Sequence, residues 1–412
     1  MSKDTNNILI LVESLDVNDS SGTKGRVALI KNMVAAGFTV TALHYSQKDI
    51  TLEGVDTVAI LEPKSRYYFL SRLQRYIYKW FGLNIGNGFE KRSGFSFNWK
   101  VAEKAFAKAL KEYAPENFDM IWTLGKGTQF RAHYAVLKDE QWHSKWYAYV
   151  HDPYPQQLYP RPYNFVPIGY RQKRSFFRKV TQKARTMVFP SMLLKEWMES
   201  YFVDIKEKSI IIPHQISKIE IPETALPNYF DSQKFSILHG GNLLNLRNPE
   251  PVLLAYKKFL VAHPEAAIDS QLLFLGKPGT YTSLFRDQEK IIPQLYASSD
   301  YVPFEQVYLM QQQTVVNIIL EAQSEISPFL PGKFAHCVAA NKPILLVGPY
   351  YSECKRLLGE DYPYSFEFKE IDGIAQALSK MYMEWRKKGY THLNRPDLEQ
   401  YLSASYLKKV LT

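Results

Sequence analysis

The sequence predicts an α/β protein of two doubly wound domains, each a parallel sheet with helices on both faces. Short apolar runs alternate with longer segments of helical periodicity along the whole chain. A proline-punctuated stretch interrupts this alternation once, near the middle. The length of 412 residues suits two domains of about 200 residues each.

The first half begins as strand, loop, helix and strand, the opening of a doubly wound sheet. The apolar runs and turn formers predict a strand at 8–12, a loop at 16–25, a helix at 27–36 and a strand at 38–43. The same criteria predict strands at 55–60, 120–123, 146–150 and 186–189, and a helix at 97–113.

The stretch 210–235 contains three prolines and is the predicted domain boundary. A Rossmann-like domain is expected at 1–212, a second at 213–394, and a helix at 395–412 that packs back on the first domain. Within the second domain we expect strands at 235–239, 271–275, 315–320 and 344–347, and helices at 249–262, 332–340 and 371–386.

Composition limits the class of protein. Hydrophobic residues make up 46% and charged residues 22%, as in ordinary globular proteins. Only Cys337 and Cys354 are present, which suits a reducing compartment, so a cytoplasmic location is expected. No apolar run is long enough for a membrane span. The formal charge of +10 indicates an anionic partner: nucleotide phosphate, nucleic acid or anionic lipid.

The turn after the first strand, 20–26, is rich in small residues. Ser21, Gly22 and Thr23 would allow a ligand to approach the backbone, and the helix that follows adds a positive dipole end. The turn is not a GxGxxG dinucleotide motif. A flexible loop without a ligand is the alternative.

The turn at 239–249 places Gly240, Gly241 and Asn242 directly after a strand, with Arg247 shortly before a proline. Glycines admit a diphosphate to the backbone, and an arginine complements it with two parallel hydrogen bonds. The alternative is a structural turn with a solvated arginine.

The segment 327–344 has two prolines that shape a loop before a helix. Ser327, Pro328, Phe329 and Leu330 form the loop, and Lys333 lies in the first helical turn, where the helix dipole favours a phosphate. A solvated lysine is the alternative.

These segments together resemble the GT-B fold, and within it the family 4 type of retaining glycosyltransferases. The resemblance covers nearly the whole chain and is carried by "SSGTKGRVALIKNMVAAGF", "HDPYP", "ARTMVFPSMLLKEWM", "LHGGNLLNLRNP" and "SPFLPGKFAHCVAANKPIL". It implies two domains that face each other across a cleft and a UDP- or GDP-sugar donor. It also implies a saccharide or lipid-linked acceptor, with surface polysaccharide as a plausible product.

The chain departs from that family in the donor segment. Family members carry two Glu residues separated by seven positions; here His336 takes the place of the second, and Ser327 or Pro328 lies near the first, with Glu325 slightly upstream. His336, which can donate or accept, would then contact the ribose. Donor identity and the retaining outcome stay open.

His151 and Asp152 follow an apolar strand, where the resemblance puts residues near the transferred sugar or the acceptor hydroxyl. In an inverting transfer either residue could be the general base. In a retaining transfer the leaving phosphate takes the proton, and Arg247 and Lys333 stabilise its charge. We favour retention on the resemblance; a structural histidine is the alternative.

No residues show metal-ligand spacing, so we expect a metal-independent enzyme without a cofactor. This expectation agrees with the GT-B resemblance, in which protein cations replace a divalent ion.

Basic and aromatic residues alternate in two segments, 64–81 and 161–185. The first segment is typical of an interfacial amphipathic helix that docks on an anionic membrane. A solvated helix face is the alternative.

Two other functions are weaker alternatives. A nucleotide-sugar epimerase would use a similar glycine turn, but it needs acid and base residues in the cleft. A non-enzymatic anion- or nucleic-acid-binding protein would explain the charge, but no nucleic-acid motif is present and nucleic acid is not expected as a partner.

Overall fold

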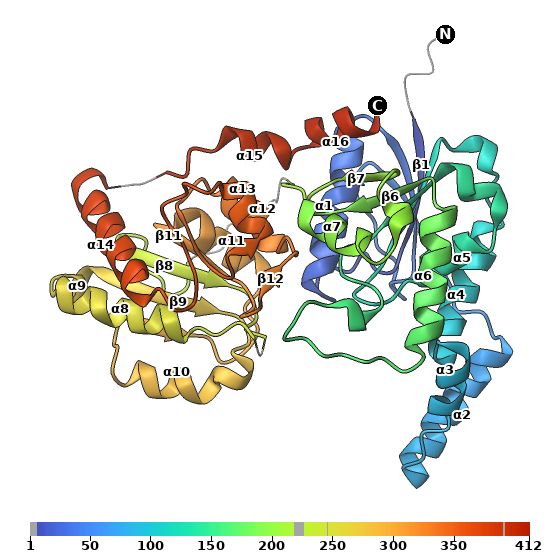
Figure 1. Cartoon of the computed structure of the whole chain (residues 1–412), viewed down its shortest axis with the longest axis horizontal. Coiled ribbons are helices and arrows are strands. Elements are labelled where there is room, and N and C mark those ends of the chain that lie inside the picture. The colour runs from blue at the N-terminus through green and yellow to red at the C-terminus, as the bar shows by residue number, and fades with distance from the viewer. Residues whose placement is uncertain (1–5, 218–225, 245, 390–391) are drawn as a thin grey trace. The chain divides into compact units, whose positions relative to one another are not determined.

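The computed structural model describes residues 6–217, 226–244, 246–389 and 392–412. The chain forms two compact units (Figure 1). The first contains Met1–Tyr159, Tyr163–Ser217 and Leu402–Thr412, and the second contains Pro160–Pro162 and Lys218–Tyr401. The division lies at Ser217 rather than at the predicted residue 212, and part of the predicted boundary stretch falls outside the described residues.

The first unit is built on a seven-stranded parallel sheet with the strand order β3-β2-β1-β4-β5-β6-β7. The last of these strands is short and was not predicted from the sequence. The strands are β1 (Asn7–Val12), β2 (Thr39–His44), β3 (Val55–Ala59), β4 (Met120–Leu124), β5 (Trp146–Tyr149), β6 (Thr186–Phe189) and β7 (Ser209–Ile211).

Alternate residues of β1 show how helices cover both faces of this sheet. Leu9 and Leu11 belong to one buried apolar cluster, whereas Ile8 and Ile10 belong to another, and all four are fully buried. Successive side chains of a strand point to opposite faces, so a strand covered on both sides is apolar throughout. The helices are α1 (Ser21–Ala35), α2 (Arg66–Phe81), α3 (Gly86–Ser93), α4 (Phe97–Leu110), α5 (Arg131–Leu137), α6 (Tyr170–Lys183) and α7 (Met192–Glu199).

Helix α1 begins earlier than the sequence predicted. The predicted loop residues Ser21, Gly22 and Thr23 form its first turn, so the expectation of a loop at this place was wrong. The reason is the cap: Ser20 is extended, and its Oγ accepts a hydrogen bond from the backbone N–H of Thr23. This cap offsets the low helix propensity of the glycines that follow.

The second unit contains a six-stranded parallel sheet with the order β10-β9-β8-β11-β13-β15, and β12 pairs separately with β14. The sequence predicted the four longest strands of this unit and missed the shorter ones. The strands are β8 (Phe235–Gly240), β9 (Ser270–Leu275), β10 (Leu295–Ala297), β11 (Val316–Leu320), β12 (Ile326–Ser327), β13 (Ile344–Val347), β14 (Tyr351–Ser352) and β15 (Ser365–Phe366).

Helices of the second unit pack around a core that includes Phe235, Tyr256 and Tyr382. Helix α14 packs along α8, so the first and last long helices of this unit are neighbours (Figure 1). The helices are α8 (Glu250–Ala262), α9 (Ala266–Asp269), α10 (Thr282–Glu289), α11 (Phe304–Gln313), α12 (Gly332–Ala339), α13 (Glu353–Leu358) and α14 (Ile371–Lys388).

The chain ends in two helices, not in the single helix expected at 395–412. Helix α15 (Pro396–Tyr401) belongs to the second unit, and α16 (Ala404–Leu411) belongs to the first. Leu407 of α16 is fully buried in a cluster that also holds residues of α1. The two helices are neighbours within the first unit (Figure 1). Ser403 caps α16 with its side chain, which explains why a second helix starts there.

Both sheets reverse their winding direction at one point, between β1 and β4 in the first and between β8 and β11 in the second. In open α/β sheets, ligands bind beyond the carboxyl ends of the strands at this switch point. The loops after these four strands are therefore where a functional site is expected. No helix in the described part of the chain is both long and apolar enough to cross a membrane.

Candidate functional site

The chain turns sharply at Gly241, beside the switch point of the second sheet. Gly241 has a φ of +129°, which strains any other residue, and its N–H donates to the carbonyl of Leu275 at 2.6 Å. A Cβ at Gly241 would lie 3.0 Å from Lys333 Nζ, and one at Gly240 would lie 2.6 Å from Val307 Cγ1. The two predicted glycines thus allow close packing and leave Lys333 next to the turn.

Lys333 lies in the first turn of α12, and its Nζ is 3.2 Å from His239 Nε2. Burial, and then the neighbouring Arg247, lower the pKa of Lys333 to about 7. Burial also lowers the pKa of His239 well below its ordinary value, so this imidazole is neutral and can accept from the ammonium.

Arg247 is half-buried in the loop after the glycine turn. Its Nη1 lies 3.4 Å from the carbonyl of Asn242, whose own Oδ1 accepts from the N–H of Lys277 at 2.9 Å. The loop is tied to the carboxyl end of β11, because Gln323 N donates to Leu246 O at 2.7 Å. Arg247 therefore lies at the switch point, near Lys333.

Glu321 is a buried carboxyl at this edge that the sequence analysis missed. It directly follows β11, is 3% exposed and accepts a hydrogen bond from Ser327 Oγ at 2.8 Å. Burial raises its pKa to about 7, although hydrogen bonds from Ser352 and Ser327 and the charge of Arg247 oppose the rise. The available signal was its position as the first polar residue after an apolar strand.

The predicted donor loop runs from β12 to the start of α12. Ser327, Pro328 and Leu330 are buried and Phe329 is half-buried, so this loop is packed rather than solvated. His336 is half-buried on α12, with its ring centroid 5.1 Å from that of Phe304. Because residues three apart share a helix face, His336 and Lys333 lie on the same side of α12.

His151 and Asp152 lie in the first unit, directly after β5, and the structure places them together. His151 Nε2 is 3.5 Å from Asp152 Oδ2. Burial lowers the pKa of His151 to about 3, so the imidazole is neutral. Burial raises the pKa of Asp152 to about 7, against a hydrogen bond with Tyr159 and the attraction of Arg26. Of the pair, Asp152 exchanges a proton near neutral pH.

Arg26, on α1, contacts the loop after β4 at the first switch point and was not predicted as a site residue. It is 5% exposed; its Nη1 donates to Gly125 O at 2.9 Å and its Nη2 to Thr23 Oγ1 at 2.6 Å. Nearby, buried Glu13 pairs with Arg131 at 2.6 Å. The contact with Gly125 links α1 to the loop after β4, and the Glu13–Arg131 pair links the loop after β1 to α5, so both depend on the fold and leave no local sequence pattern.

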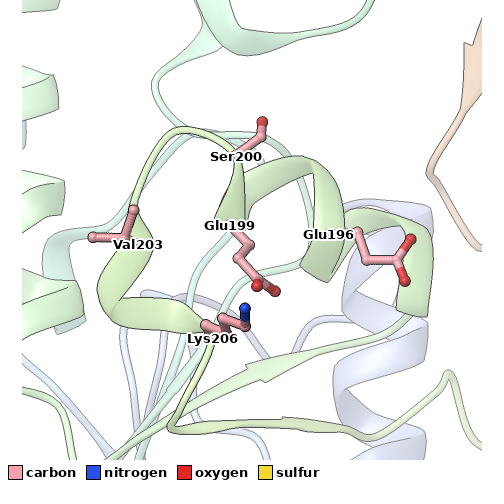
Figure 2. Close-up of a pocket in the computed structure, with 5 residues that line it drawn as sticks. All are labelled: Glu196, Glu199, Ser200, Val203 and Lys206. Carbon is pink, nitrogen blue, oxygen red and sulfur yellow. The ribbon is translucent and has the colours of Figure 1, made fainter.

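A surface depression of about 410 Å³ lies elsewhere, at the end of α7 (Figure 2). Figure 2 shows Glu199 and Lys206 pointing toward one another, with Glu196 apart from them. Helix α7 starts after the carboxyl end of β6, so its last turn lies toward the opposite edge of the sheet. Its position and its two carboxylates do not suit the predicted anionic substrate.

A smaller hollow of about 250 Å³ opens at the carboxyl ends of β13 and β15, beside Gly348. A Cβ at Gly348 would overlap the carboxyl of Glu321, so this hollow adjoins the buried acid. Lys355 Nζ lies 3.8 Å from the ring centroid of Tyr350 in its wall.

Within the described ranges, no three His, Cys, Asp or Glu side chains gather as a metal site would require.

Comparison with solved structures identifies the fold. No family model and no curated protein matches the chain. Among solved structures, trehalose-6-phosphate synthase OtsA matches with a TM-score of 0.62 and 12% identity over 98% of each chain. WaaG, a glycosyltransferase involved in lipopolysaccharide biosynthesis, matches with a TM-score of 0.60 and 10% identity, covering 98% of this chain and 99% of that one.

The chain has the GT-B fold. A glycosyltransferase from Rickettsia africae ESF-5 agrees, with a TM-score of 0.53 and 13% identity over 99% of both chains. The predicted fold class, α/β with two doubly wound parallel sheets, is confirmed. At such low identities the likeness concerns the fold, and function has to be argued from the residues of the site.

Proposed function

We propose that this chain is a glycosyltransferase that moves a hexosyl group from a UDP- or GDP-sugar to a saccharide or lipid-linked acceptor. The observation that carries the proposal is the position of Lys333, with its ammonium against the Gly241 turn and Arg247 nearby, at the second switch point. Backbone N–H groups and cations at such a place suit a diphosphate.

The structural neighbours support the same substrate class. An E. coli structure among them is bound with UDP-2-fluoro glucose, and WaaG acts in lipopolysaccharide biosynthesis. We therefore propose a nucleotide sugar as the donor and surface polysaccharide synthesis as the setting. Within the site, the diphosphate would lie against Gly240, Gly241 and Asn242, and the nucleoside and sugar against 327–330 and His336.

We favour a retaining transfer that needs no metal ion. The bond between the anomeric carbon and the diphosphate breaks, the acceptor oxygen bonds to that carbon on the same face, and the acceptor proton passes to the leaving phosphate. Arg247 and protonated Lys333 stabilise the negative charge on the leaving group. A divalent ion would otherwise have this role.

The first unit supplies the groups proposed for the acceptor side. His151 is neutral and can hydrogen-bond a sugar hydroxyl, whereas Asp152 can take a proton at neutral pH. The inverting alternative would use Asp152 as the general base. Anomeric configuration of the product, read by NMR, separates the two outcomes.

Donor turnover tests the proposed activity. The full chain is incubated with a panel of UDP- and GDP-hexoses, in parallel with and without EDTA, and release of the nucleoside diphosphate is followed. We expect slow release from one donor, lost in Lys333→Met and kept in Lys290→Met, a control at an exposed lysine. If no donor is consumed with or without EDTA, the proposed activity is wrong. If the nucleoside diphosphate is released without EDTA but not with it, the metal independence is wrong.

We further propose that α2 docks the first unit on an anionic membrane, where a lipid-linked acceptor would lie. Phe69, Leu73, Tyr76 and Trp80 are 59%, 49%, 64% and 74% exposed. Their spacing of three and four residues puts them on one face of the helix. The opposite side of α2 packs on α4, in part through Tyr67, so the apolar face stays exposed within this unit. Figure 1 shows α2 at the outer end of the unit.

Basic side chains flank this apolar face and would attract the headgroups of anionic lipids. Arg72, Arg75 and Lys79 are exposed beside it, at helical spacings of three and four residues. An interfacial helix gains affinity from apolar burial and from attraction to acidic headgroups together.

Vesicle pelleting tests the membrane proposal. The chain should pellet with phosphatidylglycerol vesicles at low salt, less with phosphatidylcholine vesicles, and several-fold less after Leu73→Ser combined with Trp80→Ser. Val261→Ser is the matched control, since Val261 is 82% exposed on α8 of the other unit. Absence of pelleting at low salt would remove the membrane contact but leave the transferase proposal intact.

A further inference from the structure

Arg26 is a buried cation that forms no direct ion pair within the described residues. Its side chain is 5% exposed, and its two hydrogen bonds go to neutral oxygens, the carbonyl of Gly125 and the hydroxyl of Thr23. None of the ion pairs formed within the described ranges includes it, and its Nε is buried with no hydrogen-bond partner there. Burial lowers the pKa of Arg26 to about 10, against the attraction of Glu13 and Asp19, each of which is paired with another cation, so Arg26 is charged at neutral pH.

The neighbouring cations at this edge are neutralised, which makes Arg26 the exception among them. Arg131 pairs with Glu13 at 2.6 Å, and Lys126 pairs with Asp19. Burying a charge that no counter-charge contacts destabilises the folded state. A cation held in this way is expected where a ligand brings the negative charge.

Asp152 does not supply the missing counter-charge. It attracts Arg26 electrostatically, but the two form no ion pair within 4 Å in the described chain, and Asp152 is hydrogen-bonded with Tyr159. Burial raises the pKa of Asp152 to about 7, so this carboxyl is partly protonated at neutral pH and carries less than a full negative charge.

The guanidinium lies where the first sheet is expected to bind a ligand. Its Nη1 bonds to Gly125, directly after β4, and a Cβ at Gly22 in the first turn of α1 would lie 3.3 Å from it. On the other side of Gly125, the ring of His151 would lie 3.6 Å from a Cβ placed there. Arg26, the amino end of a 15-residue helix and His151 thus converge on one loop at the switch point.

We propose that Arg26 binds an oxyanion, a phosphate or a carboxylate, carried by the acceptor. The anion site follows from this chain's own contacts; its assignment to the acceptor rests on the proposed transferase function. A guanidinium presents parallel N–H donors that match both oxyanions. An acceptor held there by its charged group would place its hydroxyls beside His151 and Asp152.

Inorganic phosphate is the first probe. Because the proposed diphosphate site would also bind phosphate, the titration uses the full chain with Arg247→Ala and Lys333→Met. Melting temperature is followed against phosphate concentration at constant ionic strength, since a ligand that binds the folded state raises it. We expect a saturable rise, with the apparent affinity about tenfold weaker or worse after Arg26→Gln. Lys126→Gln, a cation at the same edge that is already paired, should leave the affinity unchanged.

If Arg26→Gln does not fold, the same titration is done with Arg26→Lys. It keeps the charge but loses the paired donors, so the phosphate affinity should fall by about threefold or more. Glucuronate in place of phosphate shows whether a carboxylate is preferred, and glucose is the neutral control. Equal affinity with and without Arg26, or no stabilisation by either anion, would overturn the proposal. Nucleotide binding by the unaltered chain is measured separately, so that failure of the transferase function is seen independently.

Discussion

Lys333 changes charge close to neutral pH, and this property can be tested through the ligand. Its lowered pKa of about 7 means that the free site is only partly charged at pH 7, and a bound diphosphate would favour the protonated amine. We expect nucleoside diphosphate affinity to fall about tenfold between pH 6 and pH 8.5.

Calorimetric titrations across this pH range measure the affinity for the parent and for Lys333→Arg. Comparing the two distinguishes protonation of the lysine from protonation of the ligand. The arginine variant stays charged, so its affinity should vary much less. Parallel pH dependences in both proteins would show that Lys333 does not contact the diphosphate.

The raised pKa of Glu321 predicts that the free energy of unfolding depends on pH. Its pKa is about 7 in the folded chain and 4.5 in the unfolded chain, so the folded state loses stability as the pH rises from 4.5 through 7. Glu321→Gln keeps an acceptor for Ser327 and removes the ionisation. The variant should gain as much as about 3 kcal/mol over the parent at pH 8 and little at pH 5. Denaturant unfolding at both pH values measures this; an equal change at both would contradict it.

Residues of the site were predictable where their role depends on a local pattern. Gly241 and Arg247 stand in one turn, and Lys333 in one helix start, so the sequence alone singled them out. Arg26 becomes notable only through Gly125, a partner distant in the chain, and Glu321 had no local signal beyond its position after an apolar strand, since it packs against the distant Gly348. Such contacts leave no spacing to detect.

At the scale of single elements, the start of α1 depends on Ser20. Removing its side-chain cap with Ser20→Ala should cost about 1 kcal/mol of stability, because the Thr23 N–H loses one of its two acceptors, the Ser20 hydroxyl. Ser65 is the matched control: it precedes α2 but makes no capping hydrogen bond. Chemical denaturation of both variants checks this, and equal losses would mean that the Ser20 bond contributes nothing.

Long, apolar helices and strands were predicted from the sequence, whereas short ones were missed. Strands such as β1 and β8 are apolar runs buried on both faces, and both lie where predicted. Strands β10 and β15 have three and two residues, too few to show a pattern. The start of α1 was misplaced because glycines usually indicate a loop, and the Ser20 cap outweighs that tendency.

At the scale of the molecule, the chain's last helix belongs to its first unit. Leu407 of α16 is fully buried against that unit's core. Leu407→Ala should therefore cost about 2–5 kcal/mol in the first unit, whereas Lys409→Ala, at an exposed position, should cost little. Calorimetric unfolding with and without nucleotide distinguishes the units, since nucleotide should stabilise the second. Destabilisation confined to the nucleotide-responsive transition would contradict this prediction.

The whole fold was predictable in class but not in detail. Alternating strands and helices indicate parallel sheets, because parallel strands need crossover helices. The strand order, and with it the two switch points, depends on how the units fold in three dimensions. For the same reason the sequence did not reveal that α15 and α16 belong to different units.

The central claim is that the second unit binds a nucleoside diphosphate through the Gly241 turn, Lys333 and Arg247. Calorimetric titration with UDP, GDP, ADP and CMP, with chelator present, tests it most directly. The account predicts that one diphosphate binds in the micromolar range, and that Arg247→Ala weakens it about tenfold or more whereas Arg286→Ala, at an exposed arginine, does not. Binding of none of these nucleotides, or equal binding after Arg247→Ala, would contradict it.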